Sequence, residues 1–325
     1  MAPSPTDPVP LVKYLSEEDE PSHDFKALIS SLPQGKGWPS PPLYQYQGFW
    51  YLPAVLQGTL ACQNEFKAQD TDIFLATFVK TGTTWLKALA YSVLNRTRYS
   101  SSSQHPVLTT NPHDLVPNLE LSRSSLLTNL PSPRLIATHL PLTSLPDVPP
   151  RCKIVYLCRN PRDTFLSLWL FAAKVAGKSE LPLAAEEAVE LFCEGGCPYG
   201  PYWDHVLGYW RESVEKPERV LFLRYEDVKE DCGSCLKKLA RFLGCPFSVE
   251  EEEGGVVEEI TELCSFGSLS NLEVNKRGVT SLGTETSAFF RRGEVGDSRN
   301  FLTDQMVEKI DRVTEQKLHG SGLSF

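Results

Sequence analysis

The stretch IFLATFVKTGTTWLKAL, residues 73–89, indicates how the chain folds. Its first seven residues are apolar or small and do not alternate between polar and apolar side chains, which is typical of a strand buried on both faces. Lys80 and the small residues Thr81-Gly82-Thr83-Thr84 follow. From Thr83 to Leu94, apolar residues recur at helical spacing. A strand, a small-residue loop and a helix in this order predict an anion-binding turn.

Three more short apolar runs have the character of residues 73–79. They are Leu135–Thr138, Lys153–Cys158 and Val220–Arg224. Helical patterns separate or follow the runs, at Pro161–Ala173, Leu183–Cys193, Pro201–Ser213 and Cys232–Leu243. This alternation predicts an α/β fold with a central parallel sheet flanked by helices on both faces. Ligands of such folds bind at the carboxyl ends of the strands.

The 325 residues are long enough for one large α/β domain, which we predict for residues 25–325. Residues 1–24 are rich in Pro, Ser and acidic residues, and we expect this segment to be mobile. Three further segments have loop composition, and we predict loops at 98–110, 141–151 and 267–288.

The charge of the chain argues against two classes of partner. A formal net charge of −9 disfavours nucleic acid and membrane surfaces, both of which attract basic faces. The N-terminus lacks the basic and apolar regions of a signal peptide, and no run of 18 apolar residues is present. We therefore expect a cytoplasmic protein whose nine cysteines are reduced.

Cysteine spacing raises one alternative that involves a metal or redox chemistry. Cys232 and Cys235 have the C-x-x-C spacing, and Cys193 with Cys197 could complete a zinc site. The first pair, however, follows a charged stretch and lies within a helical pattern instead of directly after a strand. This context favours ordinary helix cysteines. No other carboxylate or His/Cys cluster has ligand spacing, so the sequence predicts no metal.

The loop at residues 80–84 has the chemistry of a phosphate cradle. Gly82 permits a tight turn, whose successive N–H groups form a nest for anionic oxygens. Lys80 adds a point charge, and Thr81, Thr83 and Thr84 add hydroxyl donors. A Walker A loop places its lysine after the second glycine, so this is a different motif. Taken alone, the loop could also be a capped helix with a solvated lysine.

Other candidate residues occur at equivalent places in the predicted fold. Lys80, His139 and Arg159 each come directly after a predicted strand. Ser167 lies two turns into the next helix on an apolar face. Near the C-terminus, Arg291 and Arg292 precede Gly293 and form a candidate clamp for a phosphate. Residues after parallel strands meet at one edge of the sheet, so we expect one shared site.

Four stretches together resemble the cytosolic sulfotransferase family, and in particular its plant members. KTGTTWLKAL is similar to the family's 5′-phosphosulfate loop, and YLCRNPRDTFLSLW to its 3′-phosphate segment. FFRRGEVGD resembles the R-K-G-x-x-G-D element, and ATHLPLTSLP the stretch with the catalytic histidine. The resemblance covers roughly residues 40–325. It implies a P-loop-like phosphosulfate-binding loop and transfer of a sulfuryl group from 3′-phosphoadenosine 5′-phosphosulfate to a hydroxyl of a small acceptor.

The resemblance also assigns roles to residues. It implies that His139 is the general base and that Lys80 stabilises the leaving phosphate. The 5′-phosphosulfate and one face of the adenine would be bound by the segment from Lys80 to Trp85, which is Lys80, Thr81, Gly82, Thr83, Thr84 and Trp85. The 3′-phosphate would be bound by Arg159, Ser167, Arg291, Arg292 and Gly293. Tyr225 and Phe266 would fix the adenosine.

The chain departs from the family pattern at several positions. Ser298 replaces the Trp of G-D-W, and we expect a less firmly packed turn there, which Ser298→Trp would tighten. Thr81 and Arg292 keep the hydroxyl and the charge of the family residues. An acid, Asp304, replaces the valine of the animal dimer motif, so we predict a monomer.

The acceptor is the least defined part of the prediction. Plant members act on flavonoids and other phenols, hydroxyjasmonate, steroids or desulfoglucosinolates, and all remain open. Four aromatic residues are candidates to line its pocket, namely Trp50, Phe78, Trp169 and Phe171. Two other functions are open as alternatives. One is a catalytically impaired relative that only binds nucleotide, and the other is a P-loop kinase, which the position of Lys80 disfavours.

Overall fold

The computed structural model describes residues 23–36, 42–99, 104–175 and 183–325. Most of the N-terminal segment 1–24 lies outside this range, and a helix already begins at His23. Within the described ranges, no helix is both long and apolar enough to cross a membrane.

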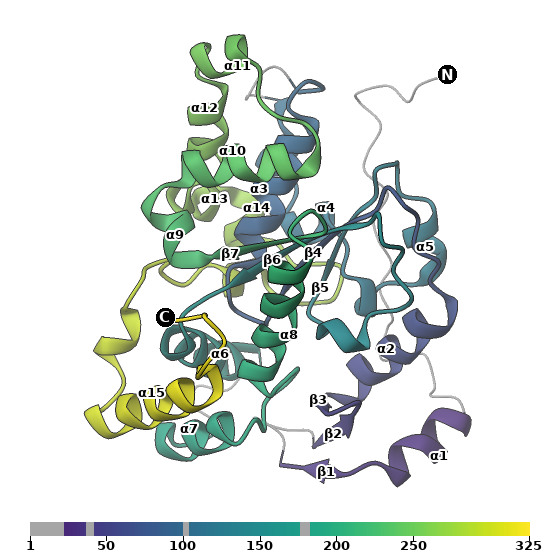
Figure 1. Ribbon diagram of the computed structural model, residues 1–325, viewed down its shortest axis with the longest axis vertical. Helices are drawn as coiled ribbons and strands as arrows, with labels where there is room; N and C mark the ends of the chain where they lie inside the picture. Colours follow the sequence, from purple (N-terminus) through teal and green to yellow (C-terminus); the bar gives the residue numbers. More distant parts are fainter. Residues whose placement is uncertain (1–22, 37–41, 100–103, 176–182) are drawn as a thin grey trace.

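A four-stranded parallel sheet forms the centre of the molecule (Figure 1). Its spatial order is β5-β4-β6-β7, with the strands β4 (Ile73–Thr77), β5 (Leu135–Thr138), β6 (Lys153–Cys158) and β7 (Val220–Arg224). In this register, Ala76 pairs with Thr138 on one side and with Tyr156 on the other. Three strands have the predicted bounds, and β4 ends two residues earlier than predicted. The predicted α/β fold is confirmed.

Helices cover both faces of the sheet because successive residues of a buried strand point to opposite sides. On β4, Phe74 and Ala76 pack into one core, whereas Ile73 and Leu75 pack into the other. The first core contains residues of α2 (Pro53–Glu65), α6 (Pro161–Val175), α7 (Ala185–Cys193), α8 (Tyr202–Glu215) and α15 (Asp304–Leu318). The second contains residues of α3 (Thr83–Asn95), α9 (Tyr225–Glu230), α10 (Cys232–Leu243) and α12 (Val256–Leu263).

Several short elements lie outside the predicted pattern. Near the N-terminus, an antiparallel sheet has the order β1-β2-β3. Its strands and the remaining short helices are β1 (Gln34–Gly35), β2 (Leu43–Tyr46), β3 (Phe49–Tyr51), α1 (His23–Ser31), α4 (Pro112–Leu115), α5 (Ser124–Thr128) and α11 (Val249–Glu253). The 3₁₀ turns are η2 (Pro106–Leu108), η3 (Leu119–Leu121), η4 (Leu142–Ser144), η5 (Thr286–Phe289) and η6 (Asp297–Asn300).

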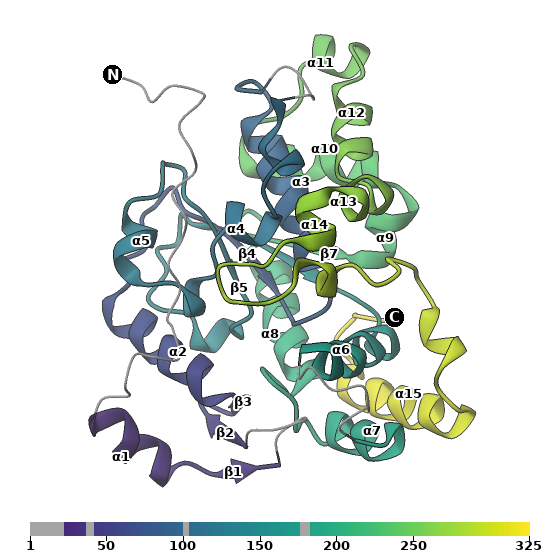
Figure 2. The same ribbon diagram turned by 180° about the vertical axis from the view of Figure 1, so that it is seen from behind.

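The predicted loop at 267–288 is wrong over its first half. Two short helices, α13 (Phe266–Asn271) and α14 (Glu273–Arg277), occupy it and lie beside α3 (Figure 2). The Ser265 hydroxyl accepts the N–H of Ser268 and so caps α13. Packing and caps stabilise these single turns although their Gly, Ser and Asn content favours a loop.

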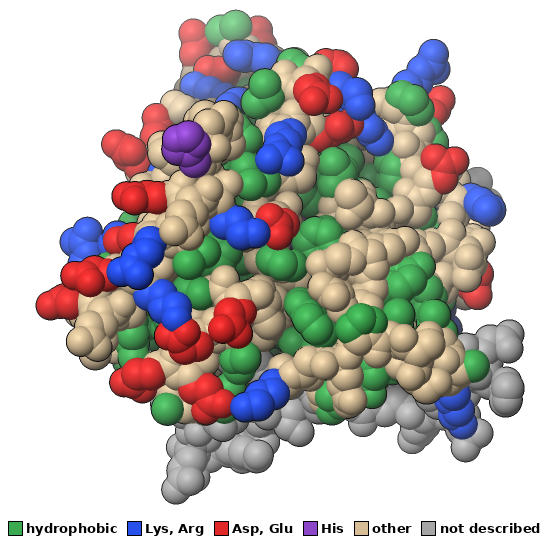
Figure 3. All heavy atoms as spheres, turned by 60° about the horizontal axis from the view of Figure 1, so that its bottom comes forward, with side chains coloured by type: hydrophobic (Ala, Val, Ile, Leu, Met, Phe, Trp, Pro, Cys, Tyr) green, Lys and Arg blue, Asp and Glu red, His purple; other side chains and the backbone are tan. Residues whose placement is uncertain are grey.

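The cysteines of the C-x-x-C pair lie in a helix, as their local sequence predicts. Cys232 and Cys235 lie on α10, as their helical context predicts, and all nine cysteines are free thiols in the structure. The described residues contain no cluster of His, Cys, Asp and Glu that could hold a metal ion. On the face in Figure 3, the Lys and Arg side chains are mixed with Asp and Glu, and among the described residues they form no separate basic patch.

A buried ion pair joins the amino ends of β4 and β5. Arg134 and Asp72 are each 1% exposed, and the Arg134 guanidinium donates to both Asp72 carboxylate oxygens, at 2.7 and 2.5 Å. Two carbonyls, those of Leu127 and Lys67, accept two further N–H groups of the guanidinium. Every nitrogen of the guanidinium therefore has a partner, and removing Arg134 or Asp72 leaves a buried charge without compensation.

We predict that Arg134→Ala lowers the free energy of unfolding by about 3–5 kcal/mol, because Asp72 then remains buried and unpaired. Urea unfolding measures this change. Arg151→Ala is the matched control, since Arg151 pairs with Asp70 at 3.6 Å while 84% of its side chain is exposed. Such a pair contributes about 0–1 kcal/mol. Equal losses in the two variants would contradict the prediction.

Candidate active site

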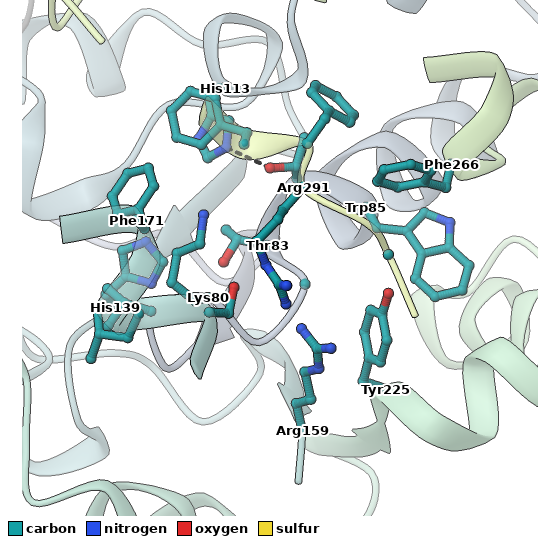
Figure 4. Close-up of a pocket in the computed structure, with 18 of the residues that line it drawn as sticks. Lys80, Thr83, Trp85, His113, His139, Arg159, Phe171, Tyr225, Phe266 and Arg291 are labelled. Carbon is teal, nitrogen blue, oxygen red and sulfur yellow. Dashed lines mark hydrogen bonds between the residues drawn. The ribbon is translucent and has the colours of Figure 1, made fainter. Parts of the chain in front are cut away.

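A cavity of about 490 Å³ lies where β4, β5 and β6 end (Figure 4). Lys80, His139 and Arg159, which follow these three strands, all line it, as predicted. Arg291 joins them from the C-terminal part of the chain. Among the described residues that line the cavity there is no Asp or Glu. One region of the cavity is therefore strongly positive.

The loop after β4 has the backbone conformation of an anion nest. Lys80 has φ +69° and Gly82 has φ +113°, both in the left-handed region. A Cβ at Gly82 would lie 2.8 Å from the Tyr225 ring, so only glycine fits. No side chain caps α3, which begins at Thr83. The first N–H groups of α3 are therefore available for an anion.

Thr81 does not contribute its hydroxyl to the cavity, contrary to our prediction. Its side chain is fully buried and donates to the carbonyls of Phe78, at 2.8 Å, and Leu157, at 2.9 Å. These bonds tie the loop to β6. Thr83 and Thr84 do line the cavity. Thr83 Oγ1 lies 2.7 Å from Thr77 Oγ1, and Thr84 Oγ1 lies 2.8 Å from His113 Nε2.

The Lys80 ammonium lies over the rings of two phenylalanines, Phe171 and Phe289. Its Nζ is 3.8 Å from the centroid of the Phe171 ring and 5.7 Å from that of Phe289. Burial lowers the pKa of Lys80 to about 7, and repulsion from Arg291 and Arg159 adds to this effect. A positive charge at this position is therefore costly until an anion enters.

His139 is held in one orientation and one tautomer. Its Nδ1 donates to the Thr77 carbonyl at 2.9 Å, so the unprotonated nitrogen is Nε2. Its backbone N–H donates to the buried carboxylate of Glu120 at 2.9 Å, and its carbonyl accepts from His205 Nε2 at 2.9 Å. Burial lowers the pKa of His139 to about 4. A neutral imidazole with a free Nε2 can accept a proton.

Two arginines of the cavity have unsatisfied N–H groups. Within the described residues, the buried Nε atoms of Arg159 and Arg291 have no hydrogen-bond partner. Arg159 Nη2 donates to the Glu294 carbonyl at 2.7 Å and lies 3.4 Å from Asp163 Oδ2. Arg291 pairs with Asp297. Buried donors without partners are uncommon, and here they fit an anion that would accept from them.

Other residues that the sequence predicts to bind the donor nucleotide also belong to the cavity. Ser167, Trp85, Tyr225, Phe266 and Gly293 line the cavity. The Trp85 and Tyr225 rings meet edge to face with centroids 5.5 Å apart. A Cβ at Gly293 would lie 2.4 Å from the Phe266 ring, so the glycine is required there. Trp85, Tyr225 and Phe266 therefore form an aromatic region suited to a planar base.

Arg292 is the one member of the predicted arginine pair that lies outside the lining of the cavity. Its guanidinium donates to Asp297 Oδ1 at 2.6 Å, and 46% of its side chain is exposed. The adjacent arginines thus share one carboxylate but point to different environments. A direct contact of Arg292 with a ligand remains a prediction.

The turn at Ser298 is firmly packed, so the expectation of a loose turn is wrong. Ser298 is 3% exposed, and its N–H donates to Asp163 Oδ1 at 2.9 Å. The N–H of Gly296 donates to the other oxygen of Asp163 at 2.7 Å. These two bonds anchor the turn to α6 without a Trp side chain.

Sequence reasoning missed several residues of the site. His113 lines the cavity although His139 was the only histidine predicted there, and its ring stacks on Phe289 at 4.1 Å. The Asn111-Pro112 pair, a helix-start signal, could have drawn attention to it. The other missed residues, which support the lining from behind, are Thr77, Lys87, Asn118 and Glu120. Buried polar residues such as these are recognisable only from tertiary contacts.

The predicted acceptor-pocket residues divide between the cavity and the core. Phe171 lines the cavity. Phe78 is fully buried with its ring edge to face against Tyr202, and Trp169 Nε1 donates to the Leu183 carbonyl at 3.2 Å. Trp50 packs against Gly35. Phe78, Trp169 and Trp50 therefore pack within the protein and do not line the cavity.

Comparisons with known proteins give consistent results. The model of the sulfotransferase domain family matches residues 70–322. "Cytosolic sulfotransferase 12" of Arabidopsis thaliana is 51% identical, and the match covers 96% of this chain and 97% of that protein. "Cytosolic sulfotransferase 15" of the same plant is 46% identical over 95% of this chain and 89% of its own.

Two solved structures are similar over most of the chain. One is an Arabidopsis thaliana protein assigned as a steroid sulphotransferase, with 43% identity, a TM-score of 0.74, and coverage of 97% of this chain and 99% of that one. The other is a mouse sulfotransferase complexed with PAP, with 27% identity, a TM-score of 0.67, and coverage of 86% and 95%.

We predict that Ser298→Trp destabilises the protein, because the space around Ser298 is already filled. Overpacking of this kind typically costs about 1–3 kcal/mol of unfolding free energy. Urea unfolding tests the prediction, with Ser298→Ala as the control that keeps the backbone N–H and adds no volume. A more stable Trp variant would instead mean that the turn has room for the larger side chain.

Proposed function

This chain belongs to the sulfotransferase family, and we propose that it moves the sulfuryl group of 3′-phosphoadenosine 5′-phosphosulfate to a hydroxyl of a small, largely apolar acceptor. One observation carries the proposal. Lys80 lies in a single cavity together with two arginines that have unsatisfied donors and with His139, whose Nε2 is unprotonated. Anion binding and proton acceptance are thus combined around one space.

The donor nucleotide fits the positive and aromatic regions of the cavity. The nest at residues 80–82 and the first N–H groups of α3 would hold the 5′-phosphosulfate. Arg159, Arg291 and Ser167 would hold the 3′-phosphate, and Trp85, Tyr225 and Phe266 the adenine. The mouse relative complexed with PAP, the desulfated form of this nucleotide, supports the assignment.

The reaction follows from the positions of Lys80 and His139. The acceptor oxygen attacks sulfur, and the bond between sulfur and the leaving phosphate oxygen breaks. Lys80 stabilises the negative charge that develops on that oxygen, as do the N–H groups of the loop. His139 Nε2 takes the proton from the acceptor hydroxyl and later releases it to solvent. Positioning and charge stabilisation supply most of the catalysis.

The apolar part of the cavity favours a neutral acceptor. The apolar residues of the lining include Leu52, Val79, Leu168, Phe171, Ala172 and Pro198. Such a surface suits a phenol, a flavonoid or a steroid better than a sugar-bearing desulfoglucosinolate, whose hydroxyls would lose hydrogen bonds to water. The 43% identical structure, assigned as a steroid sulphotransferase, supports the same class.

Transfer of radiolabelled sulfuryl from the donor to a panel of acceptors tests the function. The panel contains simple phenols, flavonoids, hydroxysteroids, hydroxyjasmonate and desulfoglucosinolates, and labelled product is separated from the donor. We expect product with phenolic or steroid acceptors. Tight binding of the desulfated donor without transfer to any acceptor would favour the alternative of a catalytically impaired nucleotide-binding relative.

We further propose that the protein acts in the cytoplasm as a monomer, with no nucleic acid, membrane or metal partner. Two relatives are named cytosolic sulfotransferases, which supports a location in the cytoplasm. The negative net charge supports the absence of polyanionic partners. Sedimentation of the purified protein with and without donor product tests the oligomeric state.

We predict that His139→Ala lowers kcat by about 10²–10⁴-fold while the affinity for the desulfated donor changes little, because only proton transfer is lost. Since burial lowers the pKa of His139 to about 4, the neutral base persists well below the pH at which an ordinary histidine is protonated. At saturating donor, where the bound anion favours protonated Lys80, the wild-type kcat should therefore stay level from neutral pH down to about pH 5.5 and fall only as pH approaches 4. Near-normal turnover of the variant would reject this base.

We predict that Arg159→Ala and Arg291→Ala raise the KM of the donor far more than that of the acceptor, because each removes a charge-assisted bond to the 3′-phosphate. A donor analogue without the 3′-phosphate should bind wild type and variants about equally. Arg292→Ala is the comparison, since its side chain lies outside the lining and should matter less. Undiminished discrimination between the two nucleotides would place the clamp elsewhere.

A further inference from the structure

Lys87 is a buried cation that the proposed transfer does not use. Its side chain is 0% exposed and lies on α3, one turn after Thr84. Lysine is rarely buried without a partner. Here Nζ donates to Asn118 Oδ1 and lies 3.2 Å from His113 Nδ1. Lys87 therefore contacts a histidine that itself lines the cavity.

His113 connects Lys87 to the donor loop. Its ring stacks on Phe289 with centroids 4.1 Å apart and an interplanar angle of 26°. On its other edge, Nε2 lies 2.8 Å from Thr84 Oγ1, the hydrogen bond drawn at His113 in Figure 4. Burial and the nearby Lys87 lower the pKa of His113 well below its usual value, so the ring is neutral and carries one N–H.

The position of that single N–H follows from Lys87. An ammonium group has donors and no acceptor. Burial lowers the pKa of Lys87 to about 7, and a bound anion favours the protonated form. When this ammonium donates to Nδ1, the ring proton is on Nε2, and Nε2–H donates to Thr84 Oγ1. The Thr84 hydroxyl then has its own hydrogen available for a further acceptor. Thr84 lines the cavity in the first turn of α3, beside the nest at residues 80–82.

We propose that Lys87 and His113 are positioning residues that make the Thr84 hydroxyl a hydrogen-bond donor to the phosphosulfate group of the donor nucleotide. The proposal rests on the proposed function, because it takes the phosphosulfate as the ligand of this loop. Without Lys87 the ring can adopt the other tautomer. The Thr84 hydroxyl would then donate to Nε2 and present only lone pairs to the anion, which repel it.

Two substitutions of His113 separate this role from a structural one. His113→Phe keeps the ring against Phe289 but loses both hydrogen bonds. His113→Gln keeps an amide that can donate to Thr84. The probe is adenosine 3′,5′-bisphosphate, which keeps the 5′-phosphate and requires no turnover. By calorimetry we expect binding to the Phe variant to be weaker by up to about tenfold, because the Thr84 hydroxyl then accepts no N–H that fixes its rotation and can turn to a backbone carbonyl of the preceding turn. We expect near wild-type binding to the Gln variant.

A double-mutant cycle tests the chain of contacts. Lys87→Met should weaken binding of the same nucleotide in the wild-type background and have no further effect in the Thr84→Val background. Nitrogen NMR shifts of the His113 ring should show Nε2 protonated in the wild type and a mixture of tautomers in Lys87→Met. Lys153→Met is the matched control, because Lys153 donates to the Phe242 carbonyl away from the cavity. It should leave binding unchanged.

The outcomes distinguish this proposal from the proposed function. If the wild type binds no nucleotide, the proposed function fails and this proposal with it. If the wild type binds but His113→Phe binds equally well, only this proposal is overturned. It is also overturned if His113→Phe changes the KM of the acceptor and not that of the donor, or if Lys87→Met weakens binding equally with and without the Thr84 hydroxyl.

Discussion

The carboxylate of Asp163 is the interaction on which the anion site depends. It is 1% exposed, accepts the N–H groups of Gly296 and Ser298, and lies 3.4 Å from Arg159. It occupies the first turn of α6, where the helix dipole favours a negative charge. One side chain thereby holds together the end of β6, the start of α6 and a turn more than 130 residues away.

Asp297 has the equivalent role for the second arginine of the cavity. It pairs with Arg291 and Arg292, and its side chain is 0% exposed. Both acids lie behind the arginines and outside the lining of the cavity. They bind other nitrogens of the guanidinium groups and leave the Nε atoms without hydrogen-bond partners among the described residues. The site is thus rigid before a ligand enters, which reduces the ordering that binding would otherwise require.

The same burial that shapes the cavity makes its free state electrostatically unfavourable. Burial lowers the pKa of Lys80 and of Lys87, each to about 7, and it also lowers the pKa of His139 and His113. A polyanion would favour the protonated lysines and so strengthen its own binding. The acidic protein as a whole repels such a ligand only weakly, since salt screens charges beyond about 8 Å. The cations that line the cavity can therefore determine whether the anion binds.

The strands and the major helices could be predicted because their cause is local. Residues buried on both faces of a strand are apolar without alternation, and β5, β6 and β7 have the bounds that this pattern predicts. Lys80, His139 and Arg159 were then placed together by topology alone. The helices α13 and α14 were missed because tertiary contacts stabilise single turns whose composition favours loops. Lys87, Glu120 and Asn118 were missed for a related reason, since a buried polar residue is explained only by its partners.

The three threonine hydroxyls of the loop show most directly where the sequence stops being informative. Thr81 bonds to two carbonyls and fixes the loop, Thr83 bonds to Thr77, and Thr84 bonds to His113. A hydroxyl both donates and accepts, so its residue type does not reveal which bond it forms. In this loop the hydroxyls first build the geometry, and the anion is left with backbone N–H groups and cations. Only a hydroxyl that already accepts a bond inside the protein, as Thr84 does when His113 Nε2 carries the proton, keeps its hydrogen for the ligand.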